Sequence, residues 1–217
     1  MSVARAMYIA VEGLIGSGKT TLCQVLRERQ HSSVRVLSEP VDAFQRFKHH
    51  NPLRLAYEDP VRNAGIAQVH IIQSSYNYYS KLLSSFKMSS SCLITERSME
   101  SPLVFLEANK ARGVHTDFVA DFLRDYWSQF NKRVMPPDVI IYLDASPQVC
   151  MNRIGVRSRE GEEHCELAYL RAMTLAYERY LCDSVHKCKL VHRIGIDMDT
   201  SVEDTVRGVL SILAGYL

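Results

Sequence analysis

Short apolar runs alternate along this chain with longer stretches in which apolar residues have helical spacing. Five runs rich in β-branched and apolar residues predict strands at Met7–Val11, Val34–Leu37, Cys92–Thr95, Val139–Leu143 and Leu190–Ile196. Most of them lack strict polar alternation, as expected for strands covered by helices on both faces, whereas the last is more polar and is expected at an edge. The pattern predicts one α/β domain over residues 1–217, built on a five-stranded, mostly parallel sheet flanked by helices.

The stretches between the runs predict amphipathic helices. One apolar face follows the first strand, at Leu22, Val25 and Leu26. Another lies in the middle of the chain, at Phe118, Phe122, Leu123 and Trp127. Each face is available to cover the sheet.

Capping residues mark two further helices. Ser146 followed by proline predicts the start of a helix that runs towards Arg153. A final helix fits the apolar spacing of Val202 and Val206, and Thr200 and Glu203 are spaced as a capping box. The predicted helices thus extend to the end of the chain.

Charge and composition exclude several classes of protein. The 217 residues include 26 basic and 24 acidic ones, so a formal charge of +2 leaves no long-range field for a nucleic-acid partner. Apolar runs fall far short of the ~20 residues that a membrane helix needs, and no leader pattern is apparent. None of the six cysteines forms a C-x-x-C pair, which disfavours a structural zinc. We expect a reduced, cytoplasmic protein that holds any anion locally.

The strongest motif directly follows the first predicted strand. It matches the phosphate-binding pattern G-x-x-x-x-G-K-[ST] along Gly13, Leu14, Ile15, Gly16, Ser17, Gly18, Lys19 and Thr20. A helix follows the motif, so free N–H groups and the helix dipole favour a polyphosphate there. Lys19 is expected to reach the β- and γ-phosphates, and the Thr20 hydroxyl to ligand Mg²⁺. The motif predicts a nucleoside triphosphate and Mg²⁺ as cofactors.

The motif alone does not distinguish a GTPase from a kinase. A GTPase switch requires an N-K-x-D motif that reads the base, and neither Asn109-Lys110 nor Asn131-Lys132 is followed by the required aspartate. A metabolic kinase instead requires a carboxylate near the transferred group, arginines that neutralise charge, and a lid.

Candidates for these parts follow later strands. Glu39, after the second strand, could accept a proton from an attacking hydroxyl, although a solvated loop acid is the alternative. After the third strand, Glu96 could help to hold the metal, and Arg97 could contact phosphate or orient Glu39, unless the two form only a surface ion pair.

A run of charge after the fourth strand predicts the lid, at about residues 153–165. It contains Arg153, Arg157 and Arg159, whose guanidinium groups could close over the transferred phosphoryl group. A charge run of this kind is more often a solvated helix end, so its place in a P-loop protein is what favours a lid.

Taken together, the motifs resemble the deoxyribonucleoside kinases, which include deoxycytidine, deoxyguanosine and mitochondrial-type thymidine kinases. Their order and approximate spacing agree from Tyr8 to Asp199. They are Gly13–Thr20, Glu39-Pro40-Val41, Tyr57-Glu58-Asp59-Pro60, Gln68, Glu96-Arg97-Ser98 and Arg153–Glu163. The resemblance implies a P-loop kinase fold with an Arg-rich lid, and transfer of the γ-phosphoryl group of ATP to the 5′-hydroxyl of a deoxynucleoside, in salvage for DNA synthesis. It also suggests a homodimer. A compact chain in which no leader is expected could be cellular or virus-encoded.

The same resemblance implies roles for individual residues. Glu39 matches the general base, and Arg97 the arginine beside it. Tyr57 and Glu162 match the pair that hydrogen-bonds the sugar 3′-hydroxyl, although the choice of Glu162 over its neighbour depends on a lid without gaps. Gln68 matches the glutamine that reads the base; by flipping, its amide can pair with thymine or cytosine.

The base pocket departs from the family pattern. Phe44 stands where the family usually has a tryptophan, so an aromatic face of smaller area is kept. Deoxycytidine-type members have an arginine and an aspartate at the positions of Ser75 and Pro102, neither of which is charged. We therefore expect thymidine as the first substrate and deoxycytidine as the second. A kinase of nucleotides or other small metabolites, and a non-catalytic nucleotide-binding module, remain the alternatives.

Overall fold

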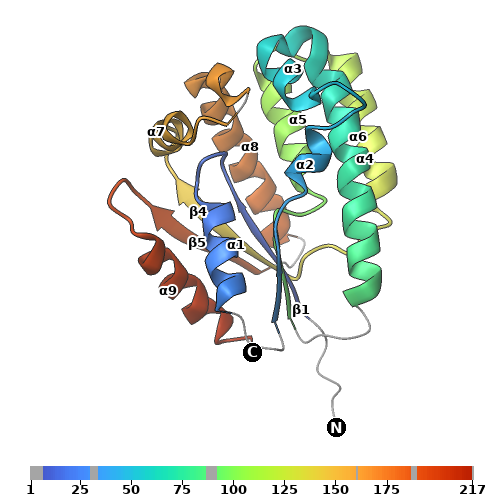
Figure 1. Ribbon diagram of the computed structural model, residues 1–217. Coiled ribbons are helices and arrows are strands. Elements are labelled where there is room, and N and C mark those ends of the chain that lie inside the picture. The colour runs from blue at the N-terminus through green and yellow to red at the C-terminus, as the bar shows by residue number, and fades with distance from the viewer. Residues whose placement is uncertain (1–6, 30–33, 87–91, 160, 187–189, 217) are drawn as a thin grey trace.

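The five predicted strands form a single parallel sheet (Figure 1). The computed structural model describes residues 7–29, 34–86, 92–159, 161–186 and 190–216. The strands are β1 (Met7–Gly13), β2 (Val34–Leu37), β3 (Cys92–Glu96), β4 (Val139–Ala145) and β5 (Leu190–Ile196). Their spatial order is β2-β3-β1-β4-β5, and every pairing is parallel. The predicted sheet is confirmed, and β5 lies at an edge as expected.

Three strands run further than their apolar patterns predict, and this places polar residues at their carboxyl ends. β1 continues to Gly13, and β3 continues to Glu96. Glu96 pairs with Val11, and Gly13 pairs with Leu143 of β4. The first glycine of the phosphate-binding motif ends the central strand, and Glu96 ends the strand beside it. Both therefore lie at the carboxyl end of the sheet, where ligands of open α/β sheets bind.

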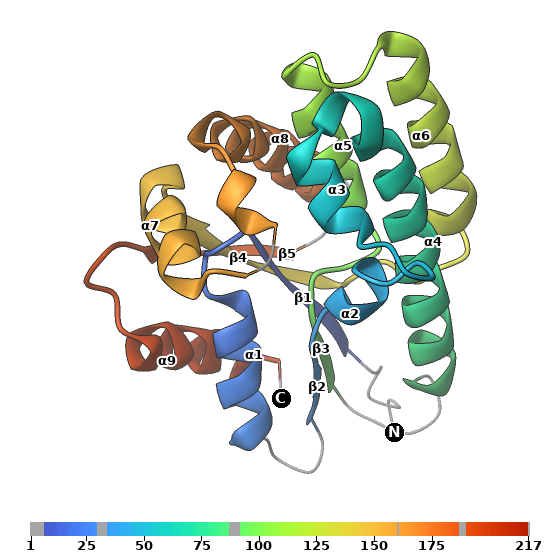
Figure 2. The same cartoon turned by 45° about the horizontal axis from the view of Figure 1, so that its top comes forward.

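Helices cover both faces of the sheet (Figure 2). On one side lie α1 (Lys19–Glu28) and α9 (Val202–Leu213), and on the other lie α4 (Pro60–Phe86), α5 (Ser101–Ala111), α6 (Asp117–Asn131) and α8 (Leu167–His186). The shorter helices are α2 (Val41–Phe44), α3 (Pro52–Glu58), α7 (Pro147–Arg157) and the 3₁₀ helix η1 (Glu162–His164). Of the described helices, none combines the length and hydropathy needed to cross a membrane.

Apolar side chains pack on both faces of the sheet. Ile9 and Ile94 belong to the cluster that contains Leu22 of α1. On the opposite face, Tyr8 packs with Ile72 of α4, and both are fully buried. Since burying one such side chain contributes about 1.5–3 kcal/mol, alternate residues of the central strand fix α1 and α4 on opposite sides of the site.

The cap of the last helix differs from the predicted one by one residue. Ser201 is the N-cap, and its hydroxyl accepts a hydrogen bond from the Asp204 backbone N–H over 3.0 Å. Thr200 instead bonds Asp197, whose carboxylate accepts from the Thr200 N–H over 2.7 Å. The predicted Thr200–Glu203 box is wrong because the Asp197 turn engages Thr200 before the helix begins.

The apolar face predicted in the middle of the chain divides into two. Leu123 of α6 is buried against Leu106 of α5, and Trp127 donates to the Met99 carbonyl over 2.8 Å. Phe118 and Phe122, however, are 80% and 55% exposed. A step of one residue turns a helix by about 100°, so Phe122 and Leu123 cannot share a face. The prediction of a single buried stripe is therefore wrong.

Candidate active site

The phosphate-binding loop joins β1 to α1, and three glycines shape it. Gly13, Gly16 and Gly18 have φ values of 148°, 81° and 100°, in the region that favours glycine. At Gly16, a Cβ would also stand 2.7 Å from the carbonyl oxygen of Cys150 on α7. The loop can thus keep its turn and its contact with α7 only with glycine at this position.

Lys19 and Thr20 begin α1 within this loop. The buried Lys19 ammonium donates to the carbonyl oxygens of Gly13 and Leu14, over 3.1 and 2.6 Å, so it is held by the loop that it closes. Burial and, to a smaller extent, the nearby Arg97 together lower the pKa of Lys19 to about 8. An anion placed against this ammonium would favour its charged form.

Thr20 and Glu96 meet across the loop, as the predicted metal site requires. The Thr20 hydroxyl donates to Oε1 of Glu96 over 2.6 Å. Hydroxyl and carboxylate oxygens are hard donors that suit Mg²⁺, which commonly keeps few protein ligands beside substrate phosphates and water. Among the described residues no group of three or more His, Cys, Asp or Glu side chains could hold a metal. The Thr20–Glu96 pair therefore fits only a metal that shares its coordination with phosphates.

Glu39 lies beside this pair. Its backbone N–H donates to Oε2 of Glu96 over 3.3 Å, and its own carboxylate accepts from Nε of Arg97 over 3.1 Å. Burial raises the pKa of the Glu39 carboxyl, whereas Arg97 opposes that rise. The strand ends thus bring together the three residues that the sequence predicted to act in one reaction.

Arg97 has an unusual backbone. Its φ of 64° lies in the left-handed region, which costs a residue with a Cβ on the order of 1 kcal/mol or more. Hydrogen bonds hold it there: its N–H donates to the Val11 carbonyl over 2.9 Å, and its carbonyl accepts from the Thr95 hydroxyl over 2.6 Å. The guanidinium lies over the ring of Phe105, 4.7 Å from its centroid. The chain therefore bends sharply after β3 and directs Arg97 towards Glu39.

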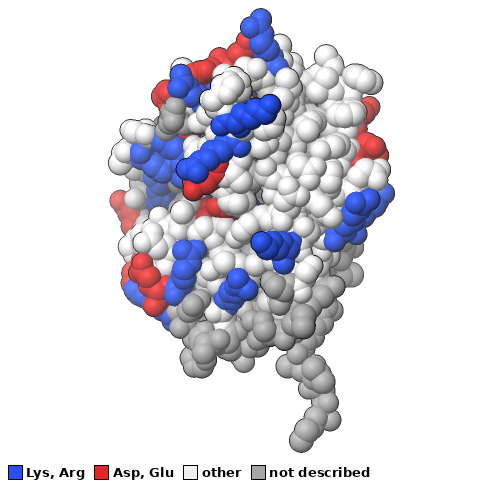
Figure 3. All heavy atoms as spheres, turned by 45° about the vertical axis from the view of Figure 1, so that its right-hand side comes forward, with Lys and Arg blue, Asp and Glu red and all other residues white. Residues whose placement is uncertain are grey.

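A cavity of about 800 Å³ surrounds these residues. Figure 3 shows basic side chains around a hollow, with acidic ones beside them. Predicted residues that line the cavity are Ile15, Gly16, Gly18, Lys19, Thr20, Glu39, Phe44, Tyr57, Gln68, Glu96, Arg97, Arg153, Arg157, Arg159 and Glu162. Gly13, Leu14 and Ser17 form the remainder of the loop but do not line the cavity. One enclosure thus contains the predicted parts of both substrate sites.

The lid arginines contact Glu162. Two nitrogens of Arg157, Nε and Nη2, donate to the carboxylate over 2.6 to 3.1 Å, and Arg159 adds a bond of 3.4 Å. Glu162 begins η1 and is buried, whereas both arginines are one third exposed. Tyr57 of α3 lies near Glu162, and burial is the main reason that its pKa is raised well above 10. Both Tyr57 and Glu162 therefore line the cavity, as the predicted pair requires.

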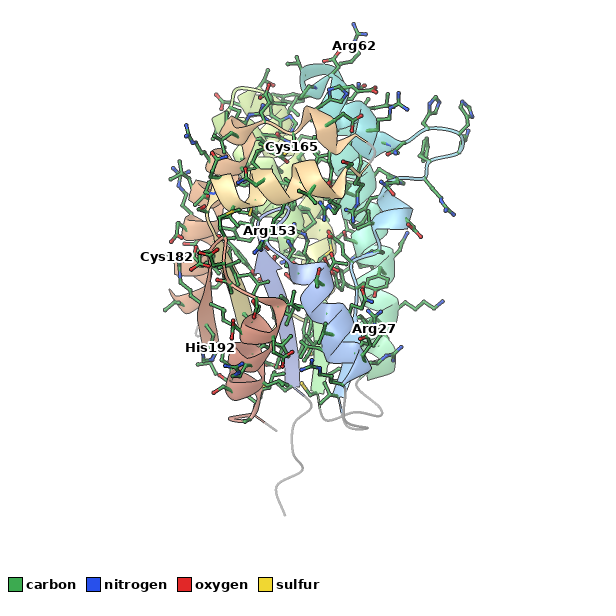
Figure 4. All side chains as sticks on the ribbon, turned by 60° about the vertical axis from the view of Figure 1, so that its left-hand side comes forward. Arg27, Arg62, Arg153, Cys165, Cys182 and His192 are labelled. Atoms are coloured by element: carbon green, nitrogen blue, oxygen red, sulfur yellow. The ribbon has the colours of Figure 1, made fainter. Side chains whose placement is uncertain are left out.

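Arg153 lies apart from the other lid arginines. Its guanidinium donates to the carbonyl oxygens of Ser17 and Asp197, over 3.4 and 3.2 Å, and so ties the loop to the segment after β5. Figure 4 shows it between α7 and the start of α1. It also borders a smaller hollow, together with Thr21, Thr200 and other residues. Arg153 thus contacts the loop itself, whereas Arg157 and Arg159 lie above the cavity on the lid.

Gln68 is buried on α4 and faces the cavity from the side opposite the loop. Its amide nitrogen donates to the Pro102 carbonyl over 2.7 Å. A carbonyl can only accept, so this contact requires the nitrogen to face Pro102 and leaves the amide oxygen for other partners. A flip of the amide would cost this hydrogen bond. Ser75 is buried as well, but neither Ser75 nor Pro102 lines the cavity.

Sequence reasoning missed part of the cavity wall. Phe105, Asn109 and Arg112 line it from α5 and its C-terminal end, and Tyr169 lines it from α8. Arg112 lies 4.9 Å from the centroid of the Tyr169 ring and donates to Glu166 over 2.6 Å. The spacing i, i+4, i+7 in the α5 set was the available signal, because it marks one helix face.

Comparison with known proteins agrees with this arrangement. The family model described as deoxynucleoside kinase matches residues 9–211. The thymidine kinase of Ictalurid herpesvirus 1 is 30% identical, over 95% of this chain and 86% of its own length. The human mitochondrial thymidine kinase 2 is 31% identical, over 80% of this chain and 63% of its own length. A deoxyguanosine kinase of Dictyostelium discoideum is 29% identical, over 82% of this chain and 60% of its own length.

Solved structures show the same fold. The deoxyadenosine kinase of M. mycoides with dCMP and dCDP bound has a TM-score of 0.75 at 20% identity, over 96% of this chain and all of that one. The same kinase with bound dATP gives an equal TM-score. The predicted P-loop kinase fold is therefore confirmed. With a phosphate-binding loop, a buried carboxylate and a family match over nearly its whole length, the chain belongs to the deoxynucleoside kinase family.

Proposed function

We propose that this protein transfers the γ-phosphoryl group of ATP to the 5′-hydroxyl of a deoxynucleoside, with thymidine as first substrate and deoxycytidine as second. The observation that carries the proposal is the position of Glu39, which lies in one cavity with Lys19 and is bonded to Arg97. The substrate oxygen forms a bond to the γ-phosphorus, the bond from that phosphorus to the β,γ-bridging oxygen breaks, and the hydroxyl proton passes to Glu39. ADP and a nucleoside 5′-monophosphate are the products.

Charge in the site supports this reaction. Lys19 and the backbone N–H groups from Gly13 to Thr20 bind the phosphates, and Arg157 and Arg159 close over them from the lid. Thr20 and Glu96 hold Mg²⁺, which neutralises charge on the phosphates when bound. Arg97 stabilises ionised Glu39, so that the carboxylate remains a proton acceptor although burial raises its pKa.

The opposite end of the cavity binds the nucleoside. Tyr57 and Glu162 offer the sugar 3′-hydroxyl a donor and an acceptor, and Phe44 presents an aromatic face to the base. Gln68 reads the base edge with an amide whose orientation the Pro102 carbonyl fixes. Because pyrimidines present opposite donor and acceptor patterns on that edge, a fixed amide favours one of them.

Thymidine is favoured by two observations. The positions of Ser75 and Pro102 have no charged side chain to select an exocyclic amine, and two of the relatives are named thymidine kinases. Other relatives are named deoxyguanosine, deoxyadenosine and deoxycytidine kinases. The proposed order of substrates is therefore tested by comparing their kcat/KM values.

A homodimer through α4 and α6 completes the proposal. Ile66 on α4 and Phe118 on α6 are 74% and 80% exposed. A Cβ at Gly65 would lie 3.6 Å from Val119, so the two helices are in contact there. Figure 3 shows a broad region without charged side chains on this side of the molecule. Exposed aromatic and aliphatic residues in one region are typical of an interface. We further propose that residues 1–217 act as one kinase domain in the cytoplasm, without a nucleic-acid partner.

A panel of deoxynucleosides with ATP and Mg²⁺ tests the proposal. We expect kcat/KM to be highest for thymidine, lower for deoxycytidine and lowest for deoxyguanosine, with thymidine monophosphate as product. Turnover of only nucleoside monophosphates would favour a nucleotide kinase, and ATP binding without substrate-stimulated turnover would favour a non-catalytic module. Both outcomes reject the proposed reaction.

A further inference from the structure

Arg97 is shared between the carboxylates of Glu39 and Glu12. Its Nε donates to Glu39, while its Nη1 lies 3.8 Å from Oε2 of Glu12, beyond hydrogen-bond distance. Glu12 is fully buried in β1 and does not line the cavity, so it cannot contact a substrate there. Only Glu39 of the two faces the reaction, yet Glu12 carries an equal charge close to the same guanidinium.

The hydroxyl of Tyr177 lies between Arg97 and Glu12. It accepts a hydrogen bond from Nη1 of Arg97 over 2.5 Å and donates to Oε2 of Glu12 over 3.0 Å. A hydroxyl has a single proton, so donation to Glu12 directs its lone pairs to Arg97. Tyr177 on α8 is fully buried, and its ring packs 5.2 Å from that of Tyr142. The orientation of this hydroxyl is therefore fixed.

Glu12 is itself held in place. Its Oε1 accepts from the Ser98 and Ser101 hydroxyls, over 3.0 and 2.6 Å. Together with Tyr177, three hydroxyls satisfy this carboxylate, and its contact with Arg97 remains a long ion pair of 3.8 Å rather than a hydrogen bond. Such a set compensates for the burial of the charge and leaves Nε of Arg97 available to Glu39.

We propose that Tyr177 and Glu12 are positioning residues of the phosphoryl transfer, and that the Tyr177 hydroxyl prevents Glu12 from competing with Glu39 for Arg97. Without that hydroxyl, Arg97 and Glu12 are oppositely charged, buried and already 3.8 Å apart, so the guanidinium moves to Glu12 and leaves Glu39 without its partner. This inference rests on the proposed role of Glu39 as the base.

The Tyr177→Phe variant tests the role of the hydroxyl between Arg97 and Glu12. Because a displacement of about 1 Å at a catalytic group can slow a reaction about 100-fold, we expect kcat to fall about 10- to 100-fold. The KM values for ATP and thymidine should change less than about threefold, since Tyr177 touches neither predicted substrate site. The matched control is Tyr180→Phe, which removes another hydroxyl-to-carboxylate bond of α8, to Glu100 over 2.9 Å. A Tyr177→Phe variant with kcat within twofold of wild type would overturn the proposal.

The double variant Tyr177→Phe/Glu12→Gln distinguishes competition between Glu12 and Glu39 for Arg97 from a general loss of structure at the site. Neutralising Glu12 removes the competing charge, so kcat should rise at least about threefold above that of Tyr177→Phe alone. A double variant no faster than the single one would overturn the proposal, because a merely structural role for Tyr177 predicts further loss.

A comparison at Glu12 tests the same arrangement if Tyr177→Phe does not fold. Glu12→Gln keeps an acceptor within reach of the Tyr177 hydroxyl, whereas Glu12→Asp keeps the charge and shortens the side chain. Positioning through the hydroxyl predicts a higher kcat for Glu12→Gln, and the reverse order would overturn it. Glu39→Gln, measured alongside, distinguishes the two proposals: a normal kcat there rejects the base, whereas a slow Glu39→Gln beside a normal Tyr177→Phe rejects only the positioning role.

Discussion

Nε of Arg97 lies 3.1 Å from Oε2 of Glu39, although the two residues follow different strands and are 58 positions apart in the chain. Glu39 therefore has a fixed direction as well as a charge. Replacing it by glutamine keeps the size of the side chain and removes its basicity. We expect Glu39→Gln to lower kcat by about 10²- to 10⁴-fold while ATP binding persists, because the phosphate loop is untouched. Steady-state rates and ATP titration would measure the two effects, and a near-normal kcat would contradict the assignment.

The orientation of Gln68 predicts base discrimination. A flip from one pyrimidine edge to the other would turn the amide oxygen towards the Pro102 carbonyl and forfeit a hydrogen bond of 2.7 Å. Losing such a bond costs about 0.5–1.5 kcal/mol, so kcat/KM for thymidine should exceed that for deoxycytidine by about two- to tenfold. Gln68→Met, which has no hydrogen-bonding amide, should bring the two values together. Equal kcat/KM values in the wild type would show that the amide does not select the base.

Gly16 provides a test of the phosphate loop with a control nearby. An alanine there would have a left-handed φ, and its Cβ would lie 2.7 Å from the Cys150 carbonyl. We expect Gly16→Ala to weaken ATP binding at least about tenfold and to destabilise the fold by about 1–3 kcal/mol. Gly155 of α7 has no such neighbour within 4 Å, so Gly155→Ala should stabilise the protein by about 0.5–1 kcal/mol. Calorimetric ATP titration and urea denaturation of both variants would measure these effects.

The exposed residues of α4 and α6 predict assembly. Phe118→Glu and Ile66→Glu place a charge in the proposed dimer interface and should shift sedimentation from a dimer to a monomer. Val156 of α7 is 89% exposed and lies outside that surface, so Val156→Glu should leave the assembly as it is. A wild type that sediments as a monomer at micromolar concentration would contradict the predicted homodimer.

Stability should depend on pH through His115. This side chain is 6% exposed, Nε2 has no hydrogen-bond partner among the described residues, and burial lowers the pKa of the imidazole. The unfolded chain therefore binds a proton at a higher pH than the folded one. Stability is fully present above the unfolded value of about 6.5 and falls as pH decreases through the folded pKa.

Thermal denaturation between pH 7.5 and 5 measures this dependence. We expect the Tm of the wild type to fall a few degrees further than that of His115→Gln over that range. His49→Gln, which removes an exposed histidine, provides the control for loss of an imidazole. Parallel Tm profiles of the wild type and His115→Gln would contradict the assignment.

The sequence predicted the sheet well because each buried strand is a short apolar run, which can be recognised without knowing its neighbours in space. All five strands and the edge position of β5 follow from such runs, and the phosphate loop follows from its glycines. The Thr200 cap was wrong because a neighbouring turn at Asp197 binds the same hydroxyl. The burial of Phe118 was wrong because spacing alone cannot tell a face that meets the core from one that meets solvent.

The candidate site was predictable only in part. Residues that follow strand ends, such as Glu39 and Arg97, could be placed at one edge because parallel strands end together. Tyr177 could not, because it lies in the middle of an amphipathic helix and owes its contacts to residues 80 and 165 positions away. The orientation of Gln68 likewise depends on a carbonyl, which no side-chain pattern reveals.

The contact between the lid and α3 joins the two ends of the cavity mechanically. Gly161 precedes η1 and packs so closely on α3 that a Cβ there would stand 3.0 Å from the Cα of Arg54. Tyr57, which we propose binds the sugar, belongs to the same short helix. A triphosphate that drew Arg157 and Arg159 away from Glu162 would leave that carboxylate without these partners, near Tyr57. Each substrate would then prepare the site of the other, and such linkage is reciprocal: thymidine should raise the affinity for ATP by the same factor as ATP raises that for thymidine.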